Sequence, residues 1–118
     1  MRVFDAKVSV NFRFRNATIL AEREVDEITA MAAGEVAKKA RKIVPVDTGA
    51  LKASIKTRRE RLMAHAAVAS THYAAFVEFG TVKMNAQPYM RPSVSDGIAV
   101  IRREAKRRVA DVMFDAGK

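Results

Sequence analysis

An apolar residue recurs at every third or fourth position between Val25 and Ile43, which is the period of a helix with one buried face. Acidic residues gather at the start of this segment and basic residues at its end, as the helix macrodipole favours. Asn16 or Thr18 can cap such a helix. Because Pro45 cannot continue it and disfavours the helical conformation just before itself, the sequence predicts a long amphipathic helix that ends near Ile43.

Two further patterns lie towards the ends of the chain. Residues Lys7 to Arg13 alternate polar and apolar side chains, which predicts a half-buried first strand. The apolar positions are Val8, Val10 and Phe12. Near the other end, Ser93 with Asp96 approximates a capping box, and we expect a final helix of about five turns after it. Its apolar stripe is Val94, Ile98, Ile101, Ala105, Val109 and Val112.

The middle of the chain carries shorter signals. Asp47 is placed to cap a short helical turn through Leu51, where Gly49 permits a tight approach of the backbone. Two strands of a hairpin are expected over Ser54–Glu60 and Leu62–Ser70.

A short buried helix is expected next, from Tyr73 to Phe79, with Gly80 closing it in the left-handed conformation. Its inner stripe would be Tyr73, Phe76 and Val77. Residues Thr81 to Gln87 show no periodicity and indicate a surface loop that ends at Pro88. The elements together predict an α+β fold in which a small, mostly antiparallel sheet packs against the long N-terminal helix and the basic C-terminal helix.

The chain has the size of one domain, and we expect residues 1–118 to form a single one. With 49% hydrophobic content, two separate cores would be short of apolar surface. The strand expected within residues 6–14 could serve as an interaction arm. The absence of cysteine excludes a disulfide framework. No apolar run approaches the ~20 residues of a membrane span and no secretory signal is evident, so we expect a soluble protein made in a cytoplasm.

The chain is strongly basic, with 22 Lys and Arg against 13 Asp and Glu and a formal charge of +9. Such an excess favours an anionic neighbour, either nucleic acid or an acidic protein face. In the last helix a dense basic band is offset locally only by Glu104. Its members are Arg102, Arg103, Lys106, Arg107 and Arg108. We expect this band to contact DNA or an acidic partner, and the alternative is the solvated face of an amphipathic helix.

No constellation of catalytic residues is evident. His65 and His72 lack a third ligand at a spacing that would complete a metal site. The glycine-rich phosphate loops of nucleotide enzymes are absent. Asp47, Thr48 and Ser54 could suggest hydrolysis, but a cap and a turn explain the first two without any substrate. We therefore expect no enzymatic activity, no cofactor and no metal.

Glu78 is the most informative carboxylate, because it lies between Val77 and Phe79 in an otherwise apolar stretch and a buried acid needs a partner. Arg91, at the start of the last helix, could supply a bidentate pair within the subunit or across to a neighbour. The alternative is a partly exposed Glu78 on the solvent face of its helix.

Three ordered segments carry a resemblance to a known family: Pro45-Val46-Asp47-Thr48-Gly49-Ala50-Leu51-Lys52-Ala53-Ser54-Ile55, Tyr73-Ala74-Ala75-Phe76-Val77-Glu78-Phe79-Gly80-Thr81 and Gln87-Pro88-Tyr89-Met90-Arg91-Pro92. Together they resemble the small neck and tail-completion proteins of long-tailed bacteriophages, over roughly residues 35 to 112. The positions that carry this signature are Pro45, Asp47, Thr48, Gly49, Leu51, Tyr73, Phe79, Gly80, Pro88 and Pro92. Tyr89 is a departure, since phenylalanine is common there.

The resemblance implies a structural protein of the virion or of a phage-like particle, synthesised in the cytoplasm of a bacterial host. Its copies would form a ring, which the family context suggests is a hexamer, at the head-tail junction or at the end of the tail tube. The ring would let DNA pass and would contact adjacent connector, terminator or tail-tube proteins. No membrane is implied.

The loop after Gly80 and the segment that follows it are expected to contact an adjacent subunit or ring, because methionine is adaptable at interfaces and tyrosine is favoured there. The candidate contacts are Lys83, Met84, Asn85, Tyr89, Met90, Arg91 and Glu78. The rival hypothesis is a stand-alone protein that binds nucleic acid without sequence specificity, which the charge of +9 supports. A dedicated DNA binder should lose duplex affinity steeply with salt, whereas a ring subunit should bind DNA only weakly.

Overall fold

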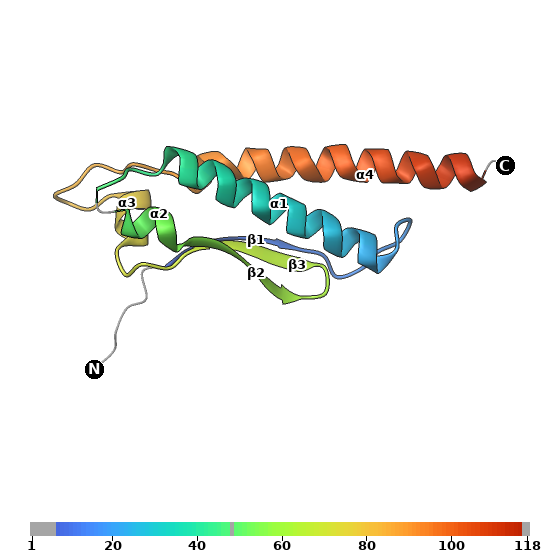
Figure 1. The fold of residues 1–118 in the computed structure, drawn as a ribbon, viewed down its shortest axis with the longest axis horizontal. Coiled ribbons are helices and arrows are strands. Elements are labelled where there is room, and N and C mark those ends of the chain that lie inside the picture. The colour runs from blue at the N-terminus through green and yellow to red at the C-terminus, as the bar shows by residue number, and fades with distance from the viewer. Residues whose placement is uncertain (1–6, 48, 117–118) are drawn as a thin grey trace.

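A long helix lies on a small sheet, and a second long helix lies against the first. The computed structural model describes residues 7–47 and 49–116. In chain order the elements are β1 (Val8–Arg13), α1 (Glu22–Ile43), α2 (Ala50–Ser54), β2 (Ile55–Arg61), β3 (Ala64–Ala69), α3 (Ala74–Phe79), the 3-10 turn η1 (Arg91–Ser93) and α4 (Val94–Ala116). Figure 1 shows α1 between the sheet and α4, with the two long helices running in opposite directions. This is the α+β architecture that the sequence predicts.

The sheet is antiparallel throughout, in the order β1-β3-β2. The pairs Val8↔Ala69 and Ile55↔Ala69 fix its register on the two sides of β3. Leu62 and Met63 form the hairpin turn between β2 and β3, and Met63 has a positive φ of 63°. Because a left-handed conformation is unfavourable for a residue with a side chain, it needs support. The Met63 N–H donates to Asp26 Oδ1 on α1 at 2.7 Å, which supplies it.

The core lies between the sheet and α1. Val8 and Phe12 point from β1 toward the buried face of α1, as the alternation in that strand predicts. Gly97 lets α4 approach this core closely, because a Cβ there would lie 2.5 Å from Phe12 Cζ and 2.7 Å from Val36 Cγ2. β1 pairs with β3 along its whole length and forms one edge of the sheet.

The predicted helix ends need two corrections. α1 begins after Ala21, which has no side-chain capping bond, and neither Asn16 nor Thr18 caps it. The predicted C-terminal end at Ile43 is confirmed, with Val44 in an extended conformation before Pro45. Ser93 does not form a capping box, because its hydroxyl donates to the Tyr89 carbonyl oxygen at 2.5 Å.

The buried line of α4 is displaced from the predicted apolar stripe. It runs through Gly97, Val100 and Glu104, whereas Ile98 and Val112 are each 39% exposed. Because Gly97 allows a close approach, the side of α4 that bears Gly97 faces α1. Glu104 is therefore buried on that side, whereas Ile98 and Val112 are not. Within the described chain, no helix combines the length and the apolar character that a membrane span requires.

Candidate functional site

The three sequence segments that characterise the chain meet at one end of the molecule. They line a groove of about 600 Å³, into which α2, α3 and the loop after α3 all contribute. Its lining includes Pro45, Gly49, Leu51, Tyr73, Val77 and Met84. Segments up to some 40 residues apart in sequence thus form one surface, at the end of the molecule remote from the end of α4 (Figure 1).

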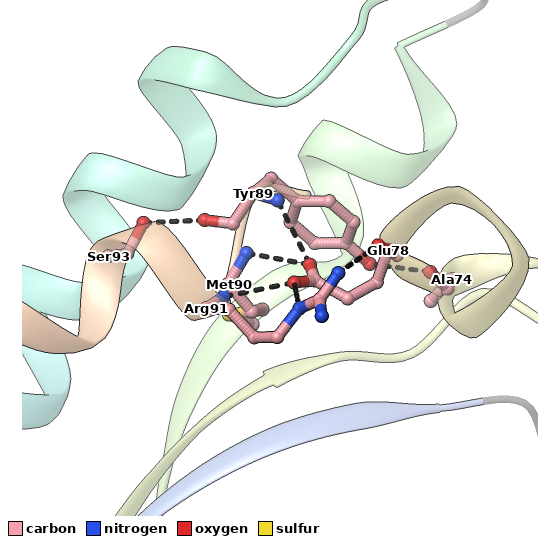
Figure 2. Close-up of polar contacts among 6 residues, drawn as sticks. All are labelled: Ala74, Glu78, Tyr89, Met90, Arg91 and Ser93. Carbon is pink, nitrogen blue, oxygen red and sulfur yellow. Dashed lines mark hydrogen bonds and ion pairs between the residues drawn. The ribbon is translucent and has the colours of Figure 1, made fainter. Parts of the chain in front are cut away.

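Glu78 is the centre of the contacts that hold this end together. Its side chain is fully buried, and its Oε1 accepts hydrogen bonds from the backbone N–H groups of Tyr89 and Met90 at 2.9 and 2.8 Å. Its Oε2 accepts from the Arg91 backbone N–H and from Arg91 Nε, each at 3.0 Å. Figure 2 shows the carboxylate surrounded by these donors. We call this arrangement the Glu78 clasp.

Two further bonds complete the clasp. The Tyr89 hydroxyl donates to the Ala74 carbonyl oxygen at 2.9 Å, and Arg91 Nη2 donates to the Glu78 carbonyl oxygen at 2.8 Å. The chain before α4 is therefore joined to both ends of the short helix α3. A carboxylate that accepts from charged and backbone donors forms stronger hydrogen bonds than a neutral acceptor would.

The electrostatics of the clasp favour an ionised Glu78. Burial alone would raise the pKa of this carboxyl, but the backbone N–H groups of Met90, Tyr89 and Arg91 and the Arg91 side chain outweigh burial and hold its pKa below its ordinary value. Burial, followed by the charge of Glu78, raises the pKa of the Tyr89 hydroxyl, which therefore stays protonated as a donor. The negative charge of Glu78 therefore stabilises the fold, because the four groups that donate hydrogen bonds to its carboxylate all belong to the same chain.

The Glu78 clasp lies where the loop of residues 81–88 begins and ends, and further contacts hold the two ends of this loop together. Gly80 has φ 79° and ψ 174°, a conformation open essentially only to glycine, and a Cβ there would lie 2.7 Å from the Ala86 backbone nitrogen. The Gln87 N–H donates to the Val77 carbonyl oxygen at 2.8 Å, and the Thr81 N–H donates to the Met84 carbonyl oxygen at 2.8 Å. Residues 81–88 are all exposed, so the loop is anchored at its ends and presents its side chains outward.

Large apolar side chains at this end of the molecule are not buried; they lie on α3, on the loop after it and on the segment before α2. We call them the apolar rim: Val46, Phe76, Phe79, Val82 and Met84. Val82 is completely exposed, and Phe79 is 59% exposed although Arg91 Cζ lies 4.7 Å from its ring centre. Clusters of exposed apolar side chains of this kind mark sites of protein contact.

The predicted inner stripe of α3 is confirmed for Tyr73 and Val77, which are partly buried against the core, and is wrong for Phe76. Ala74 and Glu78 are the buried residues of this helix, and Phe76 faces solvent. The reason is the clasp, because Glu78 must face inward to reach the three backbone donors on the segment before α4. Gly80 has the predicted positive φ, but its ψ of 174° excludes the left-handed helical cap.

The predicted cap at Asp47 is also corrected. Gly49, with φ 85°, is the residue before α2, so the N-cap position is not Asp47, and the glycine at that position has no side chain with which to cap the helix. Asp47 lines the groove instead. Thr48, which the sequence grouped with it, lies outside the described residues.

The expected contact residues fall into two sets. Lys83, Met84 and Asn85 are exposed on the loop, in a position to meet a neighbour. Glu78, Tyr89 and Met90 are fully buried within the chain, so an interface role does not fit them. Of the two arrangements considered for Glu78 and Arg91, the pair within the subunit is the one formed. The sequence reasoning missed the rim residues Phe76 and Val82, although an isolated valine in a polar loop was a visible signal.

The basic band of α4 is partly neutralised within the chain. Glu104, whose side chain is 8% exposed, pairs with Arg107 at 2.7 Å and lies within 4 Å of Arg103 and Arg108. A hydrogen bond from Arg107, outweighing burial, lowers the pKa of Glu104. Arg108 also reaches Glu27 on α1 at 2.8 Å. Arg102 and Lys106 are exposed, and no described acid pairs with them.

The two histidines lie in different surroundings. His65 is nearly buried on β3, with Nε2 3.2 Å from Asp26 Oδ1, and His72 packs edge-on against the ring of Tyr73. Among the residues that the structure describes, no group of three or more His, Cys, Asp or Glu is arranged to hold a metal ion.

The fold and this end of the molecule define a small α+β protein with an anchored loop, an apolar rim and a groove. A family model described as "Bacteriophage HK97-gp10, putative tail-component" matches residues 10–80. The chain belongs to this HK97-gp10-like family of phage tail components. No curated protein and no solved structure matched the chain. Membership of such a family places the protein in the phage particle and suggests a non-enzymatic role beside other virion proteins.

Proposed function

We propose that copies of this chain, each a single domain, assemble into a ring at the head-tail junction or at the end of the tail tube, and that DNA passes through the ring. The observation that carries the proposal is the exposure of the apolar rim residues at the same end of the molecule as the groove. A monomer gains nothing from exposing Phe76, Phe79 and Val82 together, whereas a neighbouring subunit would bury them. In a chain of a phage tail family, the expected neighbour is another virion protein.

The Glu78 clasp supports an assembly role for the rim. Binding costs less when the contacting segment is already ordered, because less conformational freedom is lost. Here Gly80 and Gln87 fix the two ends of the loop, and four hydrogen bonds to the Glu78 carboxylate fix the segment behind it. The rim is thus presented on a rigid base. A contact between two different surfaces of identical subunits closes into a ring when the rotation permits.

Electron microscopy tests the proposal directly. The purified protein at high concentration should form rings of uniform diameter, and particles that lack it should have heads and tails that are unjoined or tails that are incomplete. Particles of normal appearance and normal DNA delivery in its absence would exclude the role.

The rival function is a stand-alone, sequence-nonspecific nucleic-acid-binding protein, which the charge of +9 favours. Such a protein would bind a DNA duplex tightly as a monomer, with a steep loss of affinity on adding salt. A monomer that binds duplex DNA in this way, and never forms rings, would favour the rival.

A further inference from the structure

The open face of the sheet carries a second surface, which is distinct from the apolar rim. Val8, Val10 and Phe12 face α1, so Ser9, Asn11 and Arg13 on β1 face away from it. By register, Lys56 stands beside Val68 and Arg58 beside Ala66, and these share the face of Ser9 and Asn11. No helix or strand of the described chain lies across this face in Figure 1.

Cations stand along the β2 edge and at the end of the β1 edge of this open face, and small residues fill its centre. Arg13 is on β1, and Lys56, Arg58 and Arg61 are on β2, all of them exposed. Between them β3 contributes Ala64, Ala66 and Val68, which are buried because longer side chains from the edge strands flank them. A row of three cations on β2 thus stands two strand spacings, about 10 Å, from the β1 edge that bears Arg13.

A single acid offsets these cations within the described strands. Glu60 Oε2 lies 3.1 Å from Arg13 and its Oε1 lies 3.4 Å from Arg58, so one carboxylate is shared between two arginines. No described acid pairs with Lys56 or Arg61. The basic band of α4 differs, because Glu104 and Glu27 lie against three of its five cations. Each surface keeps two cations that no described acid contacts, but the sheet face has one acid against four cations and α4 has two acids against five, so a smaller share of the positive charge is offset on the sheet.

The composition of the face indicates what it fits. Protein interfaces are centred on large apolar or aromatic anchors, and none of the exposed large apolar side chains of the described chain lies on β1, β2 or β3. The strand residues of the open face include no aromatic side chain, so stacking on bases has no support there. Long cationic side chains beside small and hydroxyl-bearing ones suit phosphate oxygens, which carry no sequence information.

We propose that the open face of the sheet, and not the basic band of α4, is the surface that faces the phosphate backbone of DNA. This inference rests on the proposed ring, since it names the face that the ring turns toward its channel. The contact is sequence-blind and screened by salt, so DNA is attracted without being held at one place.

Salt-dependent binding of a short labelled DNA duplex tests the proposal with matched variants. Lys56→Gln/Arg61→Gln removes two cations of the sheet face, and Arg102→Gln/Lys106→Gln removes two of α4, so net charge changes equally. The slope of log affinity against log salt should become shallower by about 1.8 in the sheet variant, because each lost phosphate contact contributes about 0.9. The α4 variant should keep the parent slope, and Glu60→Gln should bind DNA more tightly than the parent.

Three results would overturn the assignment. They are an equal or larger loss in the α4 variant, an unchanged slope in the sheet variant, and negligible binding of DNA by the parent protein. Poly-glutamate bound as tightly as the duplex, with the same loss in the sheet variant, would show that the face accepts an acidic polypeptide instead. Ring formation is measured separately by native mass spectrometry on the same samples. Absence of rings with the expected slopes would remove the ring and its channel, and would leave the open sheet face as the DNA-binding surface of the rival, stand-alone protein.

Discussion

Glu78 and Arg91 are joined at two places: Arg91 Nε donates to the Glu78 carboxylate at 3.0 Å, and Arg91 Nη2 donates to the Glu78 carbonyl oxygen at 2.8 Å. The arginine therefore holds both the side chain and the backbone of the same residue. Because the Glu78 side chain is fully buried while the Arg91 side chain is 55% exposed, the pair connects the interior of the clasp to the surface that bears the rim.

Replacing Glu78 by glutamine should destabilise the fold by about 1–3 kcal/mol. The amide keeps the shape, but its one carbonyl oxygen cannot accept all four hydrogen bonds, and buried donors are left without a partner. Urea unfolding measures the change. Glu22→Gln, at an exposed position in the first turn of α1, is the control and should change stability by less than about 0.5 kcal/mol. Equal effects of the two substitutions would contradict the clasp.

The clasp also predicts a pH dependence. The folded-state pKa of Glu78 lies below its ordinary value of 4.5, so the folded protein binds fewer protons than the unfolded chain between those two values. The contribution of Glu78 to stability is full above pH 4.5 and is lost as the pH falls through the folded-state pKa. Stability should therefore decline less steeply in acid for Glu78→Gln than for the parent, and parallel declines would show that Glu78 is not the group responsible.

Gly80→Ala should destabilise the protein by at least about 2 kcal/mol. The substitution imposes a side chain on a backbone with φ 79° and ψ 174° and brings its Cβ within 2.7 Å of the Ala86 nitrogen. Gly34→Ala is the matched control, since nothing lies within 4 Å of a Cβ there and alanine favours a helix by about 0.5–1 kcal/mol. Thermal melts should shift in opposite directions, and a shift in the same direction would refute the tight closure of the loop.

Gly49→Val should cost about 1–3 kcal/mol, because valine is unfavourable at φ 85° even though the space around Gly49 is open. Asp47→Ala should leave stability within about 0.5 kcal/mol of the parent, since Asp47 does not cap α2. Chemical unfolding of both variants checks this. A loss of about 1 kcal/mol in Asp47→Ala would restore the capping role that the sequence alone suggested.

Sequence periodicity predicted the elements well where one face of a segment packs on the core. The alternation from Lys7 to Arg13 gave β1, the three-to-four spacing before Pro45 gave α1 and its end, and the hairpin of β2 and β3 was also confirmed. The turn of this hairpin, Leu62 and Met63, has no sequence signature of a turn. The positive φ of Met63 is supported instead by the hydrogen bond from its N–H to Asp26 on α1, a contact between residues distant in sequence.

Periodicity predicted only in part which side of α3 and which side of α4 is buried. The apolar pattern of α3 suggested an inward Phe76, yet Glu78 is inside because its donors come from residues 89–91, and no local pattern encodes that pairing. In α4, Gly97 sets the buried line by allowing contact with Phe12 on β1. The identity of Glu78 and Arg91 as partners followed from their chemistry, whereas the choice between an internal and an intersubunit pair needed the fold.

The central claim is that the apolar rim is a contact between subunits. Native mass spectrometry of Phe76→Asp/Val82→Asp tests it, because both side chains are exposed and their replacement leaves the core intact. Ser95→Asp/Ala99→Asp, at exposed positions of α4, adds the same charge as a control. We predict that the parent and the control form one closed oligomer, and that the rim variant is a monomer with an unchanged melting temperature. A parent protein that stays monomeric at every concentration, or a rim variant that assembles as the parent does, would contradict the account.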